Sequence, residues 1–445
     1  MFRIFIIILQ ILFLFIITNW FISNAYPVSF FLKDVKITTS TSYLALILVL
    51  ILILFYIFQK LYFFLVNKYF KLKIDIKYRN YEKGYFAFTK GMIALANNDL
   101  KKAHREANIA SRFLKDKTLN LLLLSETLKI EKKYDELNQV YEKMLLNENT
   151  EDLGLKGLMK QNLYAQDYHH AFVYGEKLFQ KNPGINDLYD SLLNIIGRTK
   201  NWYKLIDITD KAFNLRLIDK KKYSVNKSIA FYEISKIKKD SEQKEAIVLI
   251  EKALNLREFF PPYVIYYIKL LIESGKFSKA KKYLSKAWRK NPFYNYKHEI
   301  KLLAEKMKIS HVDLVNYIVS SSQTLYESRL LLSSSLIDSQ KWEDAKKCLS
   351  PLLDHKPSYE VCILMSKIEE GETNDPQRIN AWVARANFGE LNKVWICRIT
   401  NNSQNNWTSV SDLGHFNSLE YKKVNQINNL GLSNIETNLI EYINN

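Results

Sequence analysis

Two long apolar segments open this chain, and they decide where the rest of it can lie. The first covers residues 2–22 and the second residues 43–66, with a short polar stretch between them. At a rise of about 1.5 Å per residue, roughly 20 apolar residues in a helix cross the hydrocarbon core of a bilayer, which is about 30 Å thick. We therefore expect a transmembrane hairpin over residues 1–66.

The distribution of basic residues predicts the orientation of this hairpin. Residues 59–83 carry seven Lys and Arg side chains against Asp75 and Glu82, whereas the connecting loop carries two lysines and one aspartate. Because Lys and Arg near the ends of membrane spans mark the cytoplasmic side, both termini are expected in the cytoplasm. The side chains expected to lie at anionic lipid headgroups are Lys68, Lys71, Lys73, Lys77 and Arg79.

A cleaved signal peptide is the alternative to the first span. Ser23-Asn24-Ala25 resembles a small-residue cleavage site, but the apolar stretch is longer than a usual signal core and a second span follows closely. The hairpin is therefore favoured. Within the loop between the two spans, residues 28–38 alternate in parts, which is consistent with a short strand pair.

Glycine and proline are scarce, with 12 and 8 residues among 445. The phosphate-binding and turn loops of α/β enzymes use glycine, so this scarcity, together with long amphipathic stretches, predicts an all-α protein. The net charge of +18 comes largely from lysines along helical faces. A chain tethered to a membrane has a simpler use for surface lysine than nucleic-acid binding, and we expect no nucleic-acid partner. Three cysteines do not make a disulfide framework, and a cytoplasmic location keeps them reduced.

From Gly84 onward the chain repeats with a period near 34 residues. Each clear copy has two small or apolar residues seven positions apart in a second helix, often followed by a proline. This pattern resembles the tetratricopeptide repeat, a helix–turn–helix unit of 34 residues. One unit cannot bury its apolar face alone, whereas a stack can, so we expect an α-solenoid of roughly nine helix pairs over residues 84–386. A basic linker at residues 67–83 precedes it. The residues expected to let helices approach closely are Gly91, Ala103, Ala110, Ala171, Ala246, Ala253, Ala280, Ala287 and Ala345.

Two irregular spacings interrupt the period. From Leu205 to Ala246 the spacing is 41 residues, which indicates a helix lengthened by about two turns within residues 219–239. From Ala280 to Ala345 the spacing is 65 residues, close to two repeats, with an unrecognisable copy at residues 299–322. These irregularities predict a solenoid that is uneven along its length.

The sequence shows no catalytic signature, and we expect a protein that is not an enzyme. It has no glycine-rich phosphate loop, no nucleophile elbow and no histidine pair at helical spacing with a carboxylate. His169 and His170 are adjacent, and neighbours on a helix point about 100° apart, which disfavours joint ligation of haem or a metal. The expected binding site is instead the concave groove that the first helices of a solenoid form, a surface that binds extended peptides or partner helices.

The tail at residues 387–445 adds Trp395, Cys397, Trp407 and the run GHFNSLEY (414–421). With the two spans, the loop VSFFLKDVKITTS, the opening repeat YFAFTKGMIALANNDLKKAHREANIA and the run INAWVARAN before the tail, the chain resembles the HemY family of bacterial inner-membrane proteins linked to haem biosynthesis. The resemblance covers nearly the whole chain, and the opening repeat after the hairpin is its most specific part.

Some members of that family end in a zinc-ribbon-like segment with two Cys-x-x-Cys pairs. Here Cys397 matches the first cysteine, whereas Thr400, Val410 and Leu413 stand at the other three positions. A structural zinc site needs about four N or S ligands, and Cys397 with at best His415 cannot supply them. We therefore expect no metal, and we expect the tail to form a small apolar cap on the end of the solenoid.

The resemblance implies a non-enzymatic scaffold in the bacterial inner membrane, multi-pass, with both termini in the cytoplasm. Its partners would be membrane lipid and proteins, among them late haem-biosynthesis enzymes, which it would organise or supply with porphyrin intermediates. No resident cofactor is expected, although direct binding of haem or porphyrin stays open. The alternative is a general inner-membrane scaffold or chaperone for envelope-protein assembly. An enzyme acting on porphyrin itself has little support in the sequence.

Overall fold

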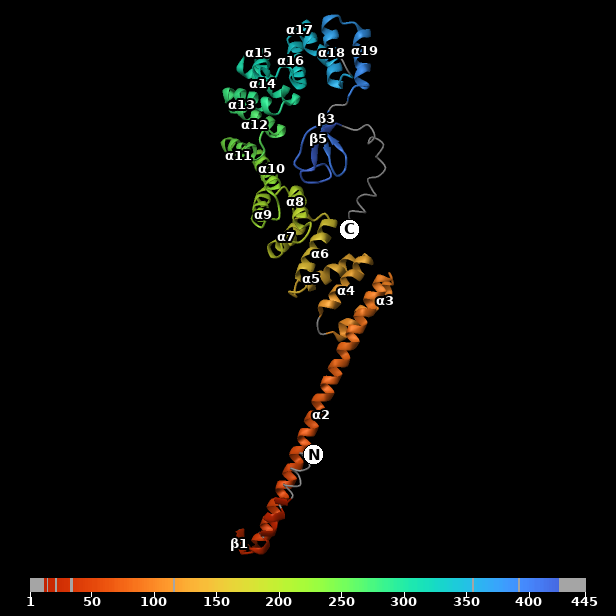
Figure 1. Ribbon diagram of the computed structural model, residues 1–445, viewed down its shortest axis with the longest axis vertical. Helices are drawn as coiled ribbons and strands as arrows, with labels where there is room; N and C mark the ends of the chain where they lie inside the picture. Colours follow the sequence, from red (N-terminus) through yellow and green to blue (C-terminus); the bar gives the residue numbers. More distant parts are fainter. Residues whose placement is uncertain are drawn as a thin grey trace. The chain divides into compact units, whose positions relative to one another are not determined.

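The computed structural model describes residues 12–13, 15–20, 22–32, 35–114, 117–353, 356–390 and 393–423. These residues are mostly helical, as the composition predicts (Figure 1). The chain divides into two compact units, residues 1–140 and 141–445, which are described separately below.

The first unit contains the strand pair expected in the polar loop. Strands β1 (Pro27–Leu32) and β2 (Val35–Ser40) are antiparallel, with Pro27 opposite Ser40. The backbone N–H of Tyr26 donates a hydrogen bond of 2.9 Å to the hydroxyl of Thr41, which joins the entry of the hairpin to the start of the next helix.

That next helix, α2 (Thr41–Ala96), runs for 56 residues without a break. The expected linker at residues 67–83 is therefore helical and continuous with both the apolar segment and the first repeat. In the described part of the chain, α2 is the one helix long and apolar enough to cross a membrane. The sequence predicts two spans; residues 2–11 of the first lie outside the described residues, so the structure supports one candidate span and not two.

The C-terminal end of α2 packs against two further helices, α3 (Leu100–Phe113) and α4 (Lys117–Ile130). Small residues make the close approach possible: Gly84, Ala87, Gly91 and Ala94 form the buried face of α2. A Cβ atom added to Gly91 would lie 2.4 Å from Cδ2 of Leu123 in α4. Gly91 therefore lies directly against Leu123, with no room for a side chain.

Helix pairs then continue to the end of the repeats. The remaining helices are α5 (Tyr134–Met144), α6 (Glu151–Tyr164), α7 (Tyr168–Lys181), α8 (Leu188–Thr199), α9 (Trp202–Asn214), α10 (Lys220–Lys238), α11 (Gln243–Leu256), α12 (Pro261–Glu273), α13 (Phe277–Lys290), α14 (Lys297–Met307), α15 (His311–Val319), α16 (Tyr326–Asp338), α17 (Trp342–Leu349), α18 (Tyr359–Glu372) and α19 (Pro376–Asn387), with short 3₁₀ turns η1 (Tyr294–Tyr296) and η2 (Ser350–Leu352). Counted from the end of α2 to α19, the described chain holds nine helix pairs, the number that the period predicts.

The irregular spacings have visible causes. Helix α10 has 19 residues, whereas the first helices on either side of it, α8 and α12, have 12 and 13. The unrecognisable copy at residues 299–322 contains a real but short pair, α14 with 11 residues and α15 with 9.

A left-handed residue at the turn inside the repeat recurs with the period. Asn98, Lys132, Gln166 and Lys200 follow one another at intervals of 34 residues, and their φ angles are 58°, 57°, 59° and 55°. At three of these turns the next residue caps the second helix; Asp167, for example, accepts a hydrogen bond of 3.1 Å from the backbone N–H of His170. The period is thus fixed by the turn as well as by the packing residues.

The structure places the eight expected alanines at the centre of the packing. All of them have side chains with no solvent exposure: Ala103, Ala110, Ala171, Ala246, Ala253, Ala280, Ala287 and Ala345. Large residues fill the space around them, among them Trp288, whose indole N–H donates a hydrogen bond of 2.9 Å to the hydroxyl of Ser328.

Candidate functional site: a groove that holds the C-terminal sheet

The tail after the repeats folds into a small sheet, residues 393–423, which we call the C-terminal sheet. Its strands are β3 (Lys393–Cys397), β4 (Ser403–Gln404) and β5 (Leu419–Lys423), in the order β4-β3-β5 and antiparallel throughout. In Figure 1, β3 and β5 lie inside the curve of the second unit's helices. The expectation of a cap on the solenoid's end is therefore wrong, because the C-terminal sheet packs against helices in the middle of the repeats.

Aromatic side chains form a cluster between the C-terminal sheet and the repeats. The ring of Trp407, which is 6% exposed, lies 5.1 Å from that of Phe260, 5.6 Å from that of Tyr232 and 5.7 Å from that of Tyr263, centroid to centroid. Edge-to-face pairs of this kind contribute about 0.5–1.5 kcal/mol beyond their buried area. Trp395 also contacts Phe260, at 5.9 Å. The aromatic rings of the tail and of the repeats shield one another from water. This burial explains why the tail packs against the repeats.

Two polar side chains on α8 hold the main chain of the C-terminal sheet. The Oδ1 atom of Asn194 accepts a hydrogen bond of 3.0 Å from the backbone N–H of Phe416. One helical turn later, Nη2 of Arg198 donates a bond of 2.5 Å to the carbonyl oxygen of Leu413. Both bonds are made to backbone atoms of the C-terminal sheet and not to its side chains. They therefore do not depend on which amino acids stand at these positions.

A buried hydrogen bond ties the C-terminal sheet to α10. The hydroxyl of Ser409 donates to Oε1 of Glu233 at 2.8 Å, and Nζ of Lys236 lies 3.1 Å from the second oxygen of the same carboxylate. Nearby, burial raises the pKa of the Tyr232 and Tyr263 hydroxyls. Tyr263 therefore stays protonated, with its hydroxyl 3.2 Å from that of Ser228.

Arg257 completes the aromatic contact from the end of α11. Its guanidinium lies 3.4 Å from the ring centroid of Phe260, a cation–π contact. Burial lowers the pKa of the Arg257 guanidinium. Phe260 is thus covered by Arg257 as well as by Trp407 and Trp395 from the C-terminal sheet.

The residues that match the zinc-ribbon positions do not assemble a metal site. Cys397 is fully buried in β3, and its Sγ lies 3.3 Å from the hydroxyl of Ser418. Burial acts to raise the pKa of the Cys397 thiol, but hydrogen bonds from Ser418 and Thr400 outweigh it and lower the pKa to about 7. Val410 instead contacts α8, where a Cβ on Gly197 would lie 2.9 Å from it. Among the described residues, no group of three or more His, Cys, Asp or Glu side chains is placed to hold a metal ion.

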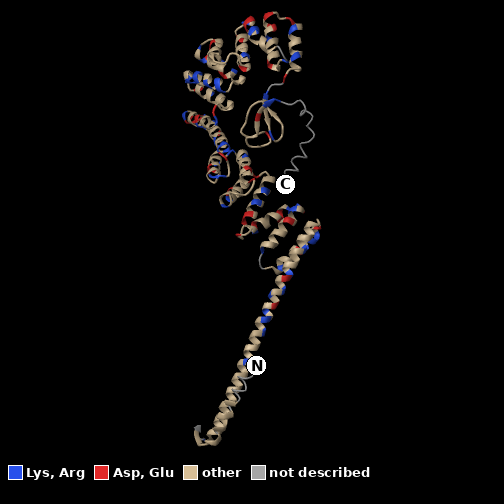
Figure 2. Cartoon of the chain, in the orientation of Figure 1, with Lys and Arg blue, Asp and Glu red and all other residues tan. Residues whose placement is uncertain are grey.

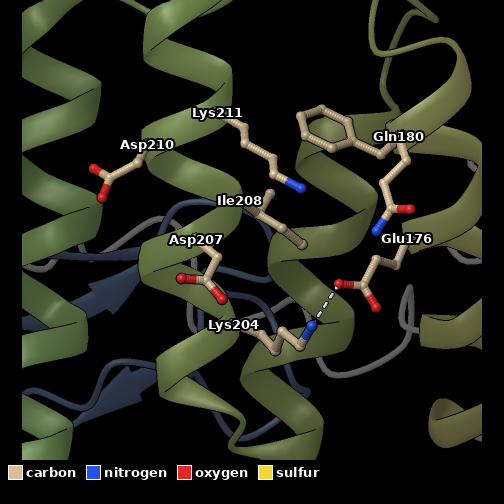
Figure 3. A pocket seen from close by; sticks show the side chains of 8 residues that line it. Glu176, Gln180, Lys204, Asp207, Ile208, Asp210 and Lys211 are labelled. Carbon is tan, nitrogen blue, oxygen red and sulfur yellow. Dashed lines mark hydrogen bonds and ion pairs between the residues drawn. The ribbon is translucent and has the colours of Figure 1, made fainter.

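The other candidate sites, a histidine pair and a small cavity, give less support for a binding function. His169 and His170 are exposed in the first turn of α7, and Nδ1 of His170 lies 2.6 Å from the Asp167 carboxylate. A cavity of about 270 Å³ lies between α7 and α9, where Lys204 forms an ion pair of 2.7 Å with Glu176 (Figure 3). This volume is below the ~300–1,000 Å³ typical of ligand pockets, and most of its lining is charged.

The five basic residues predicted at the membrane surface all lie on α2. Lys68, Lys71, Lys73, Lys77 and Arg79 are exposed, in the helical stretch after the apolar segment (Figure 2). Since α2 is continuous, these charges are held on a rigid helix and not on a flexible linker.

The sequence predicts a groove but not its occupant. Trp395 and Trp407 are visible in the tail, and two tryptophans after a helical repeat are a signal that the tail buries itself against something. Nothing in the sequence tells which helices they cover, because Tyr232, Phe260 and Tyr263 look like ordinary solenoid core.

Comparisons with known proteins add a family and several distant folds. Residues 27–130 match the family described as HemY protein N-terminus. No curated protein matches the chain. A Naa15/Naa10 complex bound to HypK-THB is 14% identical with a TM-score of 0.41, covering 71% of this chain and 54% of that one, so the chain spans about half its length.

Two tetratricopeptide structures are similar at a lower level. A repeat protein from Parabacteroides merdae is 13% identical, with a TM-score of 0.27 and coverage of 56% of this chain and 93% of that one. The TPR2AB domain of yeast Sti1 in a pHSP90 complex is 10% identical, with a TM-score of 0.30 and coverage of 68% and 98%. These scores are below 0.5, so the repeat architecture rests on the helix pairs described above. The match at residues 27–130, which include the candidate membrane helix and the first repeat, supports the HemY family for this part of the chain.

Proposed function

We propose that this protein is a non-enzymatic, membrane-anchored scaffold that binds other proteins and supports haem biosynthesis. The observation that carries the proposal is the match of residues 27–130 to the HemY N-terminus, a segment that joins an apolar helix directly to a helical repeat. In this proposal the anchor lies in the bacterial inner membrane as part of a two-span hairpin, with the repeats in the cytoplasm. Late porphyrin-pathway enzymes are the proposed partners.

The physical advantage of such a scaffold is local concentration. A binding surface tethered to the membrane turns a second binding event into an effectively intramolecular one, with no new contact needed. Helix α2 supports this arrangement because its continuous backbone holds the first repeat at a fixed distance from the apolar segment. The scaffold itself needs no catalytic group.

The test compares three forms of the protein in a host strain that lacks it. The first is the full chain, the second lacks residues 1–66, and the third carries an unrelated transmembrane hairpin in their place. Porphyrin accumulation is measured by fluorescence, and each tagged form is captured from detergent-solubilised membranes for mass spectrometry and an absorbance scan. We expect the first and third forms to restore normal porphyrin levels and to capture late-pathway enzymes, and the second to fail.

Other results would contradict the proposal in a recognisable way. Normal porphyrin levels in the strain without the protein, with envelope-assembly factors in the captured material, would favour the general scaffold or chaperone. A Soret band in the captured material, by contrast, would agree with the proposal and would show that porphyrin or haem travels with the complex. Full activity of the form without residues 1–66 would show that tethering is not the mechanism.

A further inference from the structure

Helix α13 presents a row of positive charges on its exposed side. Its sequence, FSKAKKYLSKAWRK, contains six Lys and Arg residues and no Asp or Glu (Figure 2). Apart from Ser278, every exposed residue of this helix is basic. These residues, which we call the basic face, are Lys279, Lys282, Lys286, Arg289 and Lys290. By contrast, the exposed residues of α9, α11 and α17 include acidic as well as basic side chains. The basic face is therefore a local feature and not a general excess of lysine.

Most of this charge is uncompensated within the described part of the chain. There, Lys279 is the one member of the basic face with an ion pair, at 2.7 Å from Glu251. Lys282 and Lys286 stand four positions apart, as do Lys286 and Lys290. Like charges at this spacing repel each other on a helix surface. An acidic partner would remove this repulsion.

An exposed aromatic ring lies beside the basic face. Nζ of Lys281, also on α13, is 4.1 Å from the ring centroid of Tyr317 in α15, and Tyr317 is 43% exposed. Tyrosine is one of the residues that anchor protein interfaces, whereas the charges around an anchor contribute specificity and association rate. The surface thus combines an aromatic anchor with a row of cations.

The groove on α8, α10 and α12 is not available to a partner, because Trp395 and Trp407 of the C-terminal sheet share one buried core with the repeats. We propose that the basic face of α13, with Tyr317 beside it, is a docking surface for an acidic segment of a partner protein that also carries an apolar side chain. The inference rests on the proposal that the protein binds other proteins, and it adds the surface and the chemistry of the partner.

The composition of the basic face favours a protein over nucleic acid. Four of its five members are lysines, which act as point charges, whereas the forked guanidinium of arginine matches phosphate geometry. Binding of single strands also uses aromatic rings on which bases stack, and no aromatic residue of α13 is exposed.

Acidic side chains beside the basic face disfavour a lipid surface. Glu251 pairs with Lys279, and the exposed Glu258 lies near Tyr283 of α13. A layer of anionic headgroups would meet these carboxylates together with the cations. A narrow acidic segment can follow the row of cations alone, which is why we infer a protein segment.

The test measures binding of a fluorescein-labelled peptide built of Leu-Glu-Glu-Ala repeats to the full chain in an uncharged detergent. The α13 variant combines Lys282→Gln, Lys286→Gln, Arg289→Gln and Lys290→Gln. We expect it to bind the peptide about tenfold more weakly than the unaltered chain, with a shallower dependence on salt, because fewer charges attract the peptide. The control variant has the same change in net charge on exposed lysines of other helices and should bind like the unaltered chain. It combines Lys177→Gln, Lys211→Gln, Lys244→Gln and Lys347→Gln.

Tyr317→Ala keeps the proposal testable if the α13 variant fails to fold. This change should weaken binding of the peptide and leave binding of a version with serine in place of leucine unchanged. Equal losses in the α13 and control variants would show attraction by net charge alone and overturn the proposal. Tighter binding of a single-stranded RNA oligonucleotide or of phosphatidylglycerol vesicles than of the peptide, lost in the α13 variant, would also overturn it.

The same variants separate this inference from the proposed function. In the strain that lacks the protein, we expect the α13 variant to capture less of the late-pathway enzymes than the control variant does. If both variants capture these enzymes equally and restore normal porphyrin levels, the docking surface is wrong and the proposed function stands.

Discussion

The hydroxyl of Ser409 donates a hydrogen bond of 2.8 Å to Oε1 of Glu233, a residue 176 positions earlier in the chain. The bond is buried and joins the C-terminal sheet to α10, the longest of the helices in the second unit. It is one of the contacts that join the C-terminal sheet to the repeats.

Replacing Ser409 with alanine should lower the free energy of unfolding by about 1–2 kcal/mol, because Glu233 then has a buried oxygen without its donor. Urea titration of the detergent-solubilised chain, followed by tryptophan fluorescence, measures the change. Ser241→Ala, at an exposed serine, is the control and should stay within about 0.5 kcal/mol. Equal stability of the two variants would mean that the Ser409 bond contributes nothing.

Replacing Gln166 with glycine should raise the free energy of unfolding by up to about 1 kcal/mol. Gln166 has a φ angle of 59°, a left-handed conformation in which a side chain is strained and glycine is not. The matched control is Gln161→Gly in the interior of α6, which should lower stability by about 1 kcal/mol. Both values come from thermal unfolding under the same conditions, and a loss of stability in Gln166→Gly would contradict the argument.

Gly91→Ala should destabilise the first repeat even though alanine is the better helix former. The new Cβ would lie 2.4 Å from Cδ2 of Leu123, which is fully buried and has to shift. Overpacking costs about 1–3 kcal/mol, against a helix-propensity gain of about 1 kcal/mol. Hydrogen exchange of α2 to α4 measures the result. Gly184→Ala is the control, since its nearest neighbour would be 3.9 Å away, and it should exchange like the unaltered chain.

Glu299→Gln should change how stability depends on pH. Burial raises the pKa of the Glu299 carboxyl above its usual 4.5, with Lys269 only partly offsetting it. Below pH 4.5 the Glu299 carboxyl is protonated in both the folded and the unfolded state. As the pH rises, the carboxyl ionises first in the unfolded chain, and this stabilises the unfolded state. The stability that the group contributes at low pH is therefore lost as the pH rises through the folded-state pKa. The difference in unfolding free energy, variant minus unaltered chain, should therefore be larger at pH 7 than at pH 4. Glu305→Gln, an exposed residue on the same helix, is the control and should reproduce the unaltered chain at both values of pH if burial is the cause.

We expect a less uniform orientation of α2 in the membrane when five basic residues are replaced with glutamine. These residues are Lys68, Lys71, Lys73, Lys77 and Arg79. Basic residues within about 15–20 residues of a span determine which end stays in the cytoplasm. A C-terminal reporter that distinguishes the two sides of the membrane should show a mixed population in place of a cytoplasmic one. The control replaces five lysines far from the apolar segment, Lys244, Lys282, Lys290, Lys306 and Lys367, and should keep one orientation. A mixed population in the control alone would contradict the assignment.

Much of the fold can be predicted from local patterns. The 34-residue period predicts the helix pairs because small residues such as Ala171 and Ala246 recur where two helices meet, and this requirement is local. The extra seven residues between Leu205 and Ala246 correspond to the longer α10 for the same reason. The left-handed turns escaped prediction, since asparagine, lysine, glutamine and lysine at Asn98, Lys132, Gln166 and Lys200 carry no common chemical mark.

By itself the sequence determined that this chain is helical, that it carries an apolar segment able to cross a membrane, and that its helices repeat. These properties follow from hydrophobicity and spacing within short windows, where neighbouring residues decide the outcome. Only the tertiary structure decided that the groove is occupied, because Trp407 meets Phe260 and Tyr263 across about 150 residues of chain and Ser409 meets Glu233 across 176. Such contacts depend on how the repeats curve, and curvature accumulates from small rotations at every helix pair that no local pattern records.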